Sequence, residues 1–572
     1  MKFLGSQLAR TLHDSLTFER FPPLSTSPSF RFVAADNAPV HAAFAILETL
    51  PATDPVPAVS MNADGRLLIV GEAEVAFGWA ERLAAQRDVT VFSLSAQNLT
   101  VNAVFEPEFL IEQGNSPTLS GHLGAFDLRW KTPAGERQAS FDAVLDLSPE
   151  ALLKRVELPP GYVAPGRDPL DQALAVIDLL AFDGEFEKPR YVAVNDRLCA
   201  HSRSQKAGCS QCIEVCSTAA IVSAGDKIAL DPYICQGCGT CTTVCPSGAL
   251  SFQYPRVADL GLALKAQLKA YREAGGAAPC ILFYSAASGR KVLQSMQRAG
   301  QVLPAQVVPV EIWSADAVGL DLLLGSIALG AAHVAVLGAG SQDLAPALKQ
   351  LKFGQAILNG LGYAGEYLRV VDSEQPDWLQ NLASWTPPAA IAPAEFRLLA
   401  DKRTTLEFVI DHLIKHAPQA PEAVALPLGA PFGALTVSEA CTLCMSCTSA
   451  CPASALKAAA DAPRLSFIER NCLQCGLCVN TCPENAITLT PRLLVQNRRH
   501  ERVVREAEVF CCSACGKPMG AAPAVKNMIA KLTGHSMFAT PEALARLSMC
   551  GDCRVIDLIN NEKSTKAWEM SE

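Results

Sequence analysis

The spacing of its cysteines constrains this chain more than any other feature of the sequence. None of the 22 cysteines precedes residue 199, and all except Cys280 fall into two blocks and a C-terminal group. The later block reads CTLCMSCTSACP and then CLQCGLCVNTCP, so each half has the pattern C-x2-C-x2-C-x3-C-P. Thiolates spaced in this way hold [4Fe–4S] clusters, with the fourth thiolate of each run reaching the cluster of the other run.

The later block therefore predicts two crossed ligand sets. We expect Cys441, Cys444, Cys447 and Cys482 to hold one cluster, and Cys472, Cys475, Cys478 and Cys451 to hold the other. Pro452 and Pro483 follow the fourth cysteines and fix φ where a short helix can begin. The alternative is zinc bound between two CxxC pairs, which would use four of these eight cysteines and leave the others idle.

The earlier block is the same pattern with one change. Its first half places nine residues, AHSRSQKAG, between its first two cysteines, and loops tolerate such insertions at small entropic cost. We expect Cys199, Cys209, Cys212 and Cys245 to hold one cluster, and Cys235, Cys238, Cys241 and Cys216 to hold the next. The insertion carries His201, Arg203 and Lys206, whose charge would raise the potential of a nearby cluster. We favour the simpler interpretation, a solvated basic loop.

The two blocks form an internal repeat. The second half of the earlier block recurs 237 positions later, where Cys235, Cys238, Cys241 and Cys245 correspond to Cys472, Cys475, Cys478 and Cys482. Sixteen cysteines thus predict four [4Fe–4S] clusters on one chain.

The C-terminal cysteines follow a different pattern. Cys512, Cys515, Cys550 and Cys553 form two CxxC pairs, FCCSACGKP and SMCGDCR, each with a glycine near its turn. Two such pairs are typical of a four-thiolate structural zinc site, which we favour over a fifth cluster because neither pair extends to C-x2-C-x2-C. Cys511 and Cys280 are left over, and we expect Cys280 to be a buried small residue.

The cysteine-free N-terminal part contains a degenerate nucleotide-binding pattern. Residues 66–95 alternate an apolar run, a segment with helical spacing and a second apolar run, which predicts β–α–β. A dinucleotide site needs G-x-G-x-x-G at the first turn, but here the six residues are GEAEVA. Glu72 and Glu74 would repel a phosphate, so we favour the fold without a bound FAD or NAD over a residual ligand site.

These patterns predict a multidomain chain that combines α/β and α+β parts. We expect an irregular segment over 1–60, a degenerate Rossmann-like domain over 61–190, a dicluster ferredoxin module over 191–256, a flavodoxin-like parallel α/β domain over 276–384, a linker and helix over 385–435, a second dicluster module over 436–495 and a zinc-ribbon-like tail over 508–560.

Composition narrows the function classes and the compartment. The net charge of −9 disfavours a nucleic-acid partner, and 49% apolar residues exclude a disordered chain. The N-terminus lacks the apolar run of a secretory signal. Glycines interrupt the uncharged stretch 322–340, so we expect a buried helix and strand rather than a membrane span. Clustered cysteines that bind metal fit the reducing cytoplasm.

The N-terminal half of the chain resembles the A subunit of heterodisulfide reductase and its relatives. The resemblance is carried by residues 66–95, by LSGHLGAFDLRW and by the run from GEFEKPRYVAVNDRLC to CSQCIEVC. Residues 276–373 resemble the delta-subunit domain of non-F420-reducing hydrogenases, which carries electrons in that system. The whole chain is similar to bacterial 4Fe–4S ferredoxin-type proteins. That resemblance implies redox partners, formate dehydrogenase or another molybdoenzyme among them.

Three functions follow from these patterns. The first is an electron-transfer protein that relays electrons through four clusters between redox enzymes, since the sequence carries no GxSxG, HExxH or P-loop motif for chemistry of its own. The second is an oxidoreductase subunit with a flavin or nicotinamide in an α/β domain. The third is a scaffold or maturation partner whose zinc tail binds a redox enzyme. We favour the first.

Overall fold

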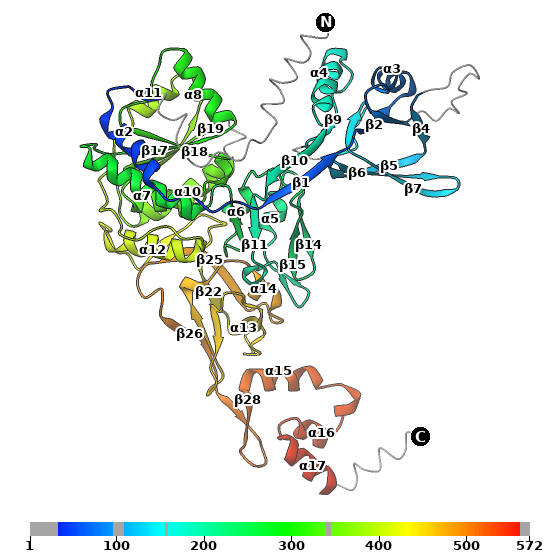
Figure 1. Cartoon of the computed structure of the whole chain (residues 1–572). Coiled ribbons are helices and arrows are strands. Elements are labelled where there is room, and N and C mark those ends of the chain that lie inside the picture. The colour runs from blue at the N-terminus through cyan, green and yellow to red at the C-terminus, as the bar shows by residue number, and fades with distance from the viewer. Residues whose placement is uncertain (1–31, 95–107, 155–157, 339–344, 561–572) are drawn as a thin grey trace.

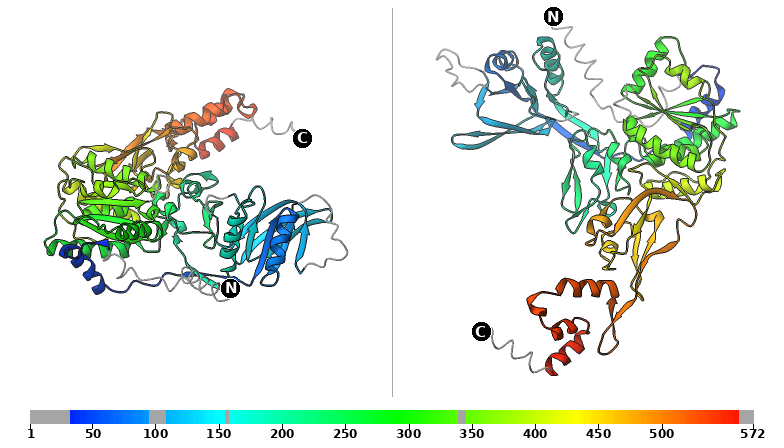
Figure 2. Two further views of the ribbon diagram at one scale, coloured as in Figure 1. Left: turned by 90° about the horizontal axis from the view of Figure 1, so that it is seen from above. Right: turned by 180° about the vertical axis from the view of Figure 1, so that it is seen from behind.

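The computed structural model describes residues 32–94, 108–154, 158–338 and 345–560. Two α/β domains stand apart on either side of module 1, the cysteine-bearing segment 191–256 (Figures 1 and 2). Module 2, residues 436–495, lies below module 1 and the central α/β domain, and the tail, residues 508–560, extends beyond it (Figure 1). The two cysteine modules therefore occupy the middle of a branched molecule.

The N-terminal α/β domain is built on a five-stranded parallel sheet. Its order is β4 (Leu110–Gln113), β3 (Asp88–Ser93), β2 (Arg66–Gly71), β8 (Ala143–Asp146) and β9 (Tyr162–Val163). Helices α3 (Ala73–Leu83) and α4 (Pro169–Leu180) share an apolar core with this sheet. A three-stranded antiparallel sheet, β5 (Asn115–His122), β6 (Ala125–Thr132) and β7 (Gly135–Phe141), buries Trp130 and Phe126 against the other face. The β–α–β pattern predicted over 66–95 is thus present as β2, α3 and β3.

The N-terminal segment is more ordered than the sequence predicts. Residues 1–31 lie outside the described part, but residues 38–45 form helix α2 (Ala38–Ala45) instead of irregular chain. Val40 and Phe44 of this helix are buried in the core of the central α/β domain. The chain then crosses to the N-terminal α/β domain, where β1 (Ala58–Ala63) pairs antiparallel with β10 (Gly184–Pro189) (Figure 1). Sequence reasoning missed this helix because its apolar face is recognisable only beside the domain that covers it.

The central α/β domain has a four-stranded parallel sheet in the order β18 (Val307–Ile312), β17 (Cys280–Ser285), β19 (His333–Gly338) and β20 (Leu368–Asp372). Helices α7 (Val257–Glu273), α8 (Ser288–Arg298), α9 (Leu320–Ala328), α10 (Ala345–Gly360) and α11 (Trp378–Ala383) accompany it. Of the stretch 322–340, residues 322–338 divide between buried α9 and β19, and residues 339 and 340 lie outside the described part. Cys280 is 1% exposed at the start of β17. Among the helices of the described residues, none is both long and apolar enough to cross a membrane.

The two modules are built alike. Module 1 pairs β11 (Val192–Val194) with β16 (Leu250–Phe252) and β14 (Ile221–Ala224) with β15 (Lys227–Leu230), around short helices α5 (Gln211–Glu214) and α6 (Thr240–Val244). Module 2 pairs β22 (Gly433–Val437) with β25 (Ile487–Leu494) and β23 (Leu456–Ala458) with β24 (Arg464–Ile468), around α13 (Ser446–Ala450) and α14 (Leu477–Thr481). Helix α12 (Lys402–Lys415) precedes module 2 and packs on α9.

The tail differs from the zinc ribbon that its sequence predicts. A hairpin, β27 (Val509–Cys511) and β28 (Pro518–Ala521), carries the first CxxC pair in its turn. Helices α15 (Ala522–Leu532) and α16 (Pro541–Arg546) follow, and the second pair lies at the start of α17 (Gly551–Asn560). The second pair is therefore held by a helix end instead of a second hairpin.

Candidate metal centres

In module 1 the structure brings together the eight cysteines as two groups of four. Group I comprises Cys216, Cys235, Cys238 and Cys241, and group II comprises Cys199, Cys209, Cys212 and Cys245. In group I, burial raises the pKa of Cys241 well above its ordinary value, and the other three thiols raise it further. In group II, burial raises the pKa of Cys212 to about 12, and the other three thiols add to the rise. The fourth cysteine of each run thus lies among the thiols of the other run, which is the arrangement that crossed ligand sets would need.

Module 2 repeats this crossed arrangement. Group III comprises Cys451, Cys472, Cys475 and Cys478, and group IV comprises Cys441, Cys444, Cys447 and Cys482. Burial raises the pKa of Cys478, and the three other thiols of group III raise it further. Burial likewise raises the pKa of Cys447 to about 12, again with contributions from its own group. Four thiols this close do not all ionise readily without a cation, and the iron ions of a cluster would supply that positive charge.

Backbone geometry prepares these loops for sulfur ligation. Gly237, Gly239 and Gly476 adopt positive φ values of 79°, 82° and 81° beside the second cysteine of their runs. Leu443 and Met445 adopt positive φ at the equivalent positions, although left-handed backbone is unfavourable for residues with a side chain. Backbone amides also donate to sulfur, from Ala220 to Cys216 (3.2 Å), Ala455 to Cys451 (3.3 Å) and Ala486 to Cys482 (3.3 Å). Such donors stabilise the negative charge of a thiolate-bound cluster.

The four groups lie in series. Groups I and II adjoin within module 1, since Cys212 is among the thiols that raise the pKa of Cys241. Groups III and IV adjoin within module 2, since Cys447 acts on Cys478 in the same way. Across the two modules, burial raises the pKa of Cys475 to about 11, and Cys209 of group II adds to this rise. The order along the molecule is therefore I, II, III, IV.

The contact between groups II and III is made by the inserted residues 200–208, which form the hairpin β12 (Ser202–Arg203) and β13 (Lys206–Ala207). Ala200 packs with Leu473 and Leu477 of module 2, and Cys209 and Cys475 border this apolar patch. The Asn480 side-chain amide donates to the Ala207 carbonyl at 2.7 Å. Lys206 is exposed, as expected of a basic loop residue. The hairpin contacts module 2 through Ala200 and the Ala207 carbonyl, which its composition did not indicate.

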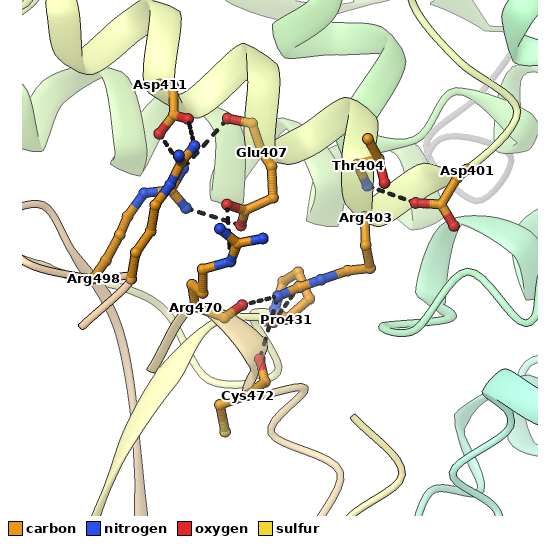
Figure 3. Close-up of polar contacts among 10 residues, drawn as sticks. Asp401, Arg403, Thr404, Glu407, Asp411, Pro431, Arg470, Cys472 and Arg498 are labelled. Carbon is orange, nitrogen blue, oxygen red and sulfur yellow. Dashed lines mark hydrogen bonds and ion pairs between the residues drawn. The ribbon is translucent and has the colours of Figure 1, made fainter. Parts of the chain in front are cut away.

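Four basic side chains that sequence reasoning missed lie beside the four groups. Lys188 donates to the Cys235 carbonyl (2.9 Å) at group I, and Lys402 donates to the Cys245 carbonyl (3.1 Å) at group II. Arg403 approaches the Cys472 carbonyl (3.5 Å) at group III (Figure 3). At group IV, burial raises the pKa of Cys441, and the positive charge of Arg505 acts in the opposite direction. None of these residues lies within a cysteine run, so the spacing of the runs carries no information about them.

The four C-terminal cysteines form a fifth candidate centre. The sulfur atoms of Cys512, Cys515, Cys550 and Cys553 lie within 4.8 Å of one another, a group that could hold a metal ion. The Cys550 amide donates to the Cys512 sulfur at 3.2 Å and lowers the pKa of Cys512 to about 6, which favours the thiolate that metals bind. Cys511 is exposed at the end of β27 and is not part of this group.

The nucleotide-type turn of the N-terminal α/β domain does not fit a dinucleotide. A Cβ at Gly71 would lie 3.0 Å from the Leu147 side chain, so this glycine serves strand packing. Glu72 and Glu74 are exposed at the N-terminus of α3, where a phosphate would have to bind. The residues present at this turn therefore disfavour FAD.

Comparison with known proteins identifies the two modules. Two family models, each described as a 4Fe-4S dicluster domain, match residues 179–249 and residues 440–487. A search of curated proteins gave no significant match. The matched segments contain groups I to IV, so the chain is an iron–sulfur protein with an electron-transfer role. It is of the ferredoxin type, with two dicluster domains on one chain, and such domains exchange electrons with redox partners.

Proposed function

We propose that this protein relays electrons through four [4Fe–4S] clusters held by groups I to IV. The observation that carries the proposal is the contact between modules, where Cys209 of group II and Cys475 of group III border one apolar patch. Two dicluster domains placed apart would be two separate carriers. Joined at this point, they form one path from group I to group IV, with zinc bound by the tail as a structural metal.

The two ends of this path face different parts of the molecule. Near group I, Trp313 of the central domain packs at a tilt against Tyr191 with ring centroids 5.2 Å apart, and His122 of the N-terminal domain stacks on Tyr233 at 4.5 Å. Near group IV, Cys444 is exposed and the tail is adjacent. We infer that one redox partner docks at each end, formate dehydrogenase or another molybdoenzyme among the candidates, in the cytoplasm.

The strand orders support the family resemblances of the two α/β domains. Numbered within its own sheet, the N-terminal domain runs 3-2-1-4-5 and the central domain runs 2-1-3-4. These are the orders of Rossmann-like and flavodoxin-like sheets. They support a relationship to the A subunit of heterodisulfide reductase and to the hydrogenase delta-subunit domain, with the fold retained and the phosphate loop lost.

Anaerobic analysis of iron, sulfide and zinc, combined with EPR, tests the proposal. Four clusters and one four-thiolate zinc site require about sixteen iron ions and about one zinc ion per chain. About half that iron would contradict the relay, because one module would then lack its clusters.

The strand order of the N-terminal domain also favours a second candidate, an oxidoreductase subunit that binds a flavin or nicotinamide. In such sheets the ligand binds outside the carboxyl ends of the strands, where the order reverses. Flavin released by acid in a stoichiometric amount would replace the first proposal with this one, whereas its absence together with full iron content would support the relay alone.

A further inference from the structure

We propose that the hairpin 200–208 and the basic pair Lys402–Arg403 are positioning elements that set the electron step between groups II and III. This inference rests on the proposed relay and concerns its central step. Electron tunnelling slows exponentially with distance, so the step that joins two separately folded modules depends on what holds their metal loops together.

The hairpin makes the apolar part of the contact between the modules, and the packing at Gly208 leaves no space for a side chain. Gly208 adjoins Cys209, and a Cβ at Gly208 would overlap the Leu477 side chain and lie 2.6 Å from the Ala200 carbonyl oxygen. Leu477 is fully buried and begins helix α14 directly after Gly476, between Cys475 and Cys478. Any side chain at position 208 must therefore move the loops of groups II and III apart or deform one of them.

The basic pair provides the polar half of the contact. Lys402 donates to the carbonyls of Thr242 (2.9 Å), Thr243 (2.8 Å) and Cys245 (3.1 Å), which satisfies the C-terminal end of α6 beside group II. The next residue, Arg403, turns to module 2 and donates to the carbonyls of Pro431 (3.0 Å) and Arg470 (2.7 Å), with Cys472 at 3.5 Å (Figure 3). Two adjacent residues of one helix thus bind one metal loop of each module.

Helix α12 keeps this pair in place. Asp401 accepts the Thr404 amide at the N-terminus of the helix, and the Arg403 guanidinium lies 4.8 Å from the centre of the Phe432 ring. One turn further, Glu407 lies between Arg470 of module 2 and the buried Arg498 (Figure 3). Arg403 is only partly exposed, and the carbonyls of Pro431 and Arg470 accept hydrogen bonds from its guanidinium.

A cavity at the junction of the two modules leaves space into which the metal loops could move. A space of about 210 Å³ opens between Leu198 and Ser247 of module 1 and Pro452 and Leu473 of module 2, with Arg403 in its wall. Apolar packing does not fill this side of the junction, so the metal loops have room to shift if the basic pair is removed. The hairpin and the pair are therefore expected to act from the two sides of the junction.

The test compares the full-length chain with Gly208→Ala, Lys402→Met and Arg403→Met. One control is Gly78→Ala, since Gly78 has open space around its Cβ position, and another is Lys415→Met, an exposed residue of the same helix. Each protein is analysed for iron, reduced anaerobically by dithionite, and examined by EPR for spin–spin interaction between clusters. Freeze-quenched samples then give the rate at which the second module is reduced after the first.

We expect the three variants to keep the iron content and the final extent of reduction of the wild type. In these variants, module 2 should be reduced more slowly than in the wild type, and the spin–spin interaction between groups II and III should be weaker. Lys402→Arg should keep the rate and the interaction closer to the wild type than Lys402→Met does, because arginine can still donate to the carbonyls. Wild-type rates and spectra in all three variants would overturn the inference, and so would loss of iron, because the residues would then retain clusters. If the wild type itself lacked iron in one module, the proposed relay would fail instead.

Discussion

At the scale of single residues, Cys245 distinguishes two possible ligand sets for the clusters of module 1, one within each cysteine run and one crossed between the runs. In the sequence it ends the run of Cys235, Cys238 and Cys241, but its thiol lies with Cys199, Cys209 and Cys212. We therefore expect Cys245→Ala and Cys212→Ala to remove the same cluster, with a loss of about four iron ions per chain. Anaerobic iron analysis and EPR measure both effects.

Cys241→Ala is the matched control for this prediction, because Cys241 belongs to group I. It should remove a different EPR signal from the one lost in Cys212→Ala. If Cys245→Ala instead gave the spectrum of Cys241→Ala, the ligands of module 1 would not be crossed.

His333 makes the central α/β domain sensitive to acid. It is 1% exposed, stacks on Trp385 at 3.9 Å and bonds to the Thr386 carbonyl at 3.2 Å. Burial lowers the pKa of His333 from 6.5 to about 4, so between these values the unfolded chain binds more protons and stability falls as pH falls. From pH 7.5 to 5 this one group should remove about 2 kcal/mol from the free energy of unfolding.

His333→Gln tests this dependence, because glutamine can still donate to the Thr386 carbonyl but does not titrate. Urea unfolding at pH 7.5 and at pH 5 gives the two free energies for each protein. The variant should lose less stability between the two pH values than the wild type does. An equal loss in both proteins would show that the acid sensitivity lies elsewhere.

At the scale of elements, the tail contacts module 2, but its four cysteines form a group of their own. Helix α15 reaches module 2 through Asn527 and Lys531, which bind the Glu484 carboxylate at 2.8 Å and 3.3 Å. The four thiols of the tail lie in their own group beyond this helix. We expect Cys512→Ser to lose about one zinc ion per chain while about sixteen iron ions remain, since the cluster ligands are untouched.

Cys511→Ser is the matched control, because Cys511 is the exposed neighbour of Cys512 and lies outside the group. It should keep both metals. If Cys512→Ser lost iron and no zinc, the tail would hold a fifth cluster, the alternative that the spacing of its cysteines left open.

The elements also show how far sequence reasoning can reach. The β–α–β unit over 66–95 and the parallel strands within 276–384 follow from local spacing, and the structure contains them. The crossed ligand sets follow from the same kind of spacing and stay a prediction. Three other features depend on contacts between segments that are distant in the sequence. They are helix α2, the position of the second CxxC pair at the start of α17, and the contact of the hairpin 200–208 with module 2. Lys402 and Arg403 illustrate the same limit, since two basic residues at the start of a helix look like solvated charges until their carbonyl partners are known.

At the scale of the whole molecule, the arrangement places the metal groups in the middle and the α/β domains and tail around them (Figure 1). The two α/β domains lie on either side of module 1 (Figure 2), with His122 of one domain stacked on Tyr233 and Trp313 of the other packed at a tilt against Tyr191. In the proposed relay, group I is therefore the end close to both α/β domains, and group IV is the end close to the tail. Because the two ends of the proposed relay have different surroundings, each end can bind a different redox partner.

The number of electrons that the whole chain accepts tests this arrangement. Each [4Fe–4S] cluster takes one electron in its low-potential couple, and zinc takes none, so anaerobic coulometry should give about four electrons per chain. A bound flavin would raise the total by about two and a fifth cluster by about one, whereas an empty module would lower it by about two. Because each alternative changes the total by a different amount or sign, coulometry on wild-type protein of known iron content separates them. About four electrons with about sixteen iron ions is the combination that a relay of four clusters without flavin requires.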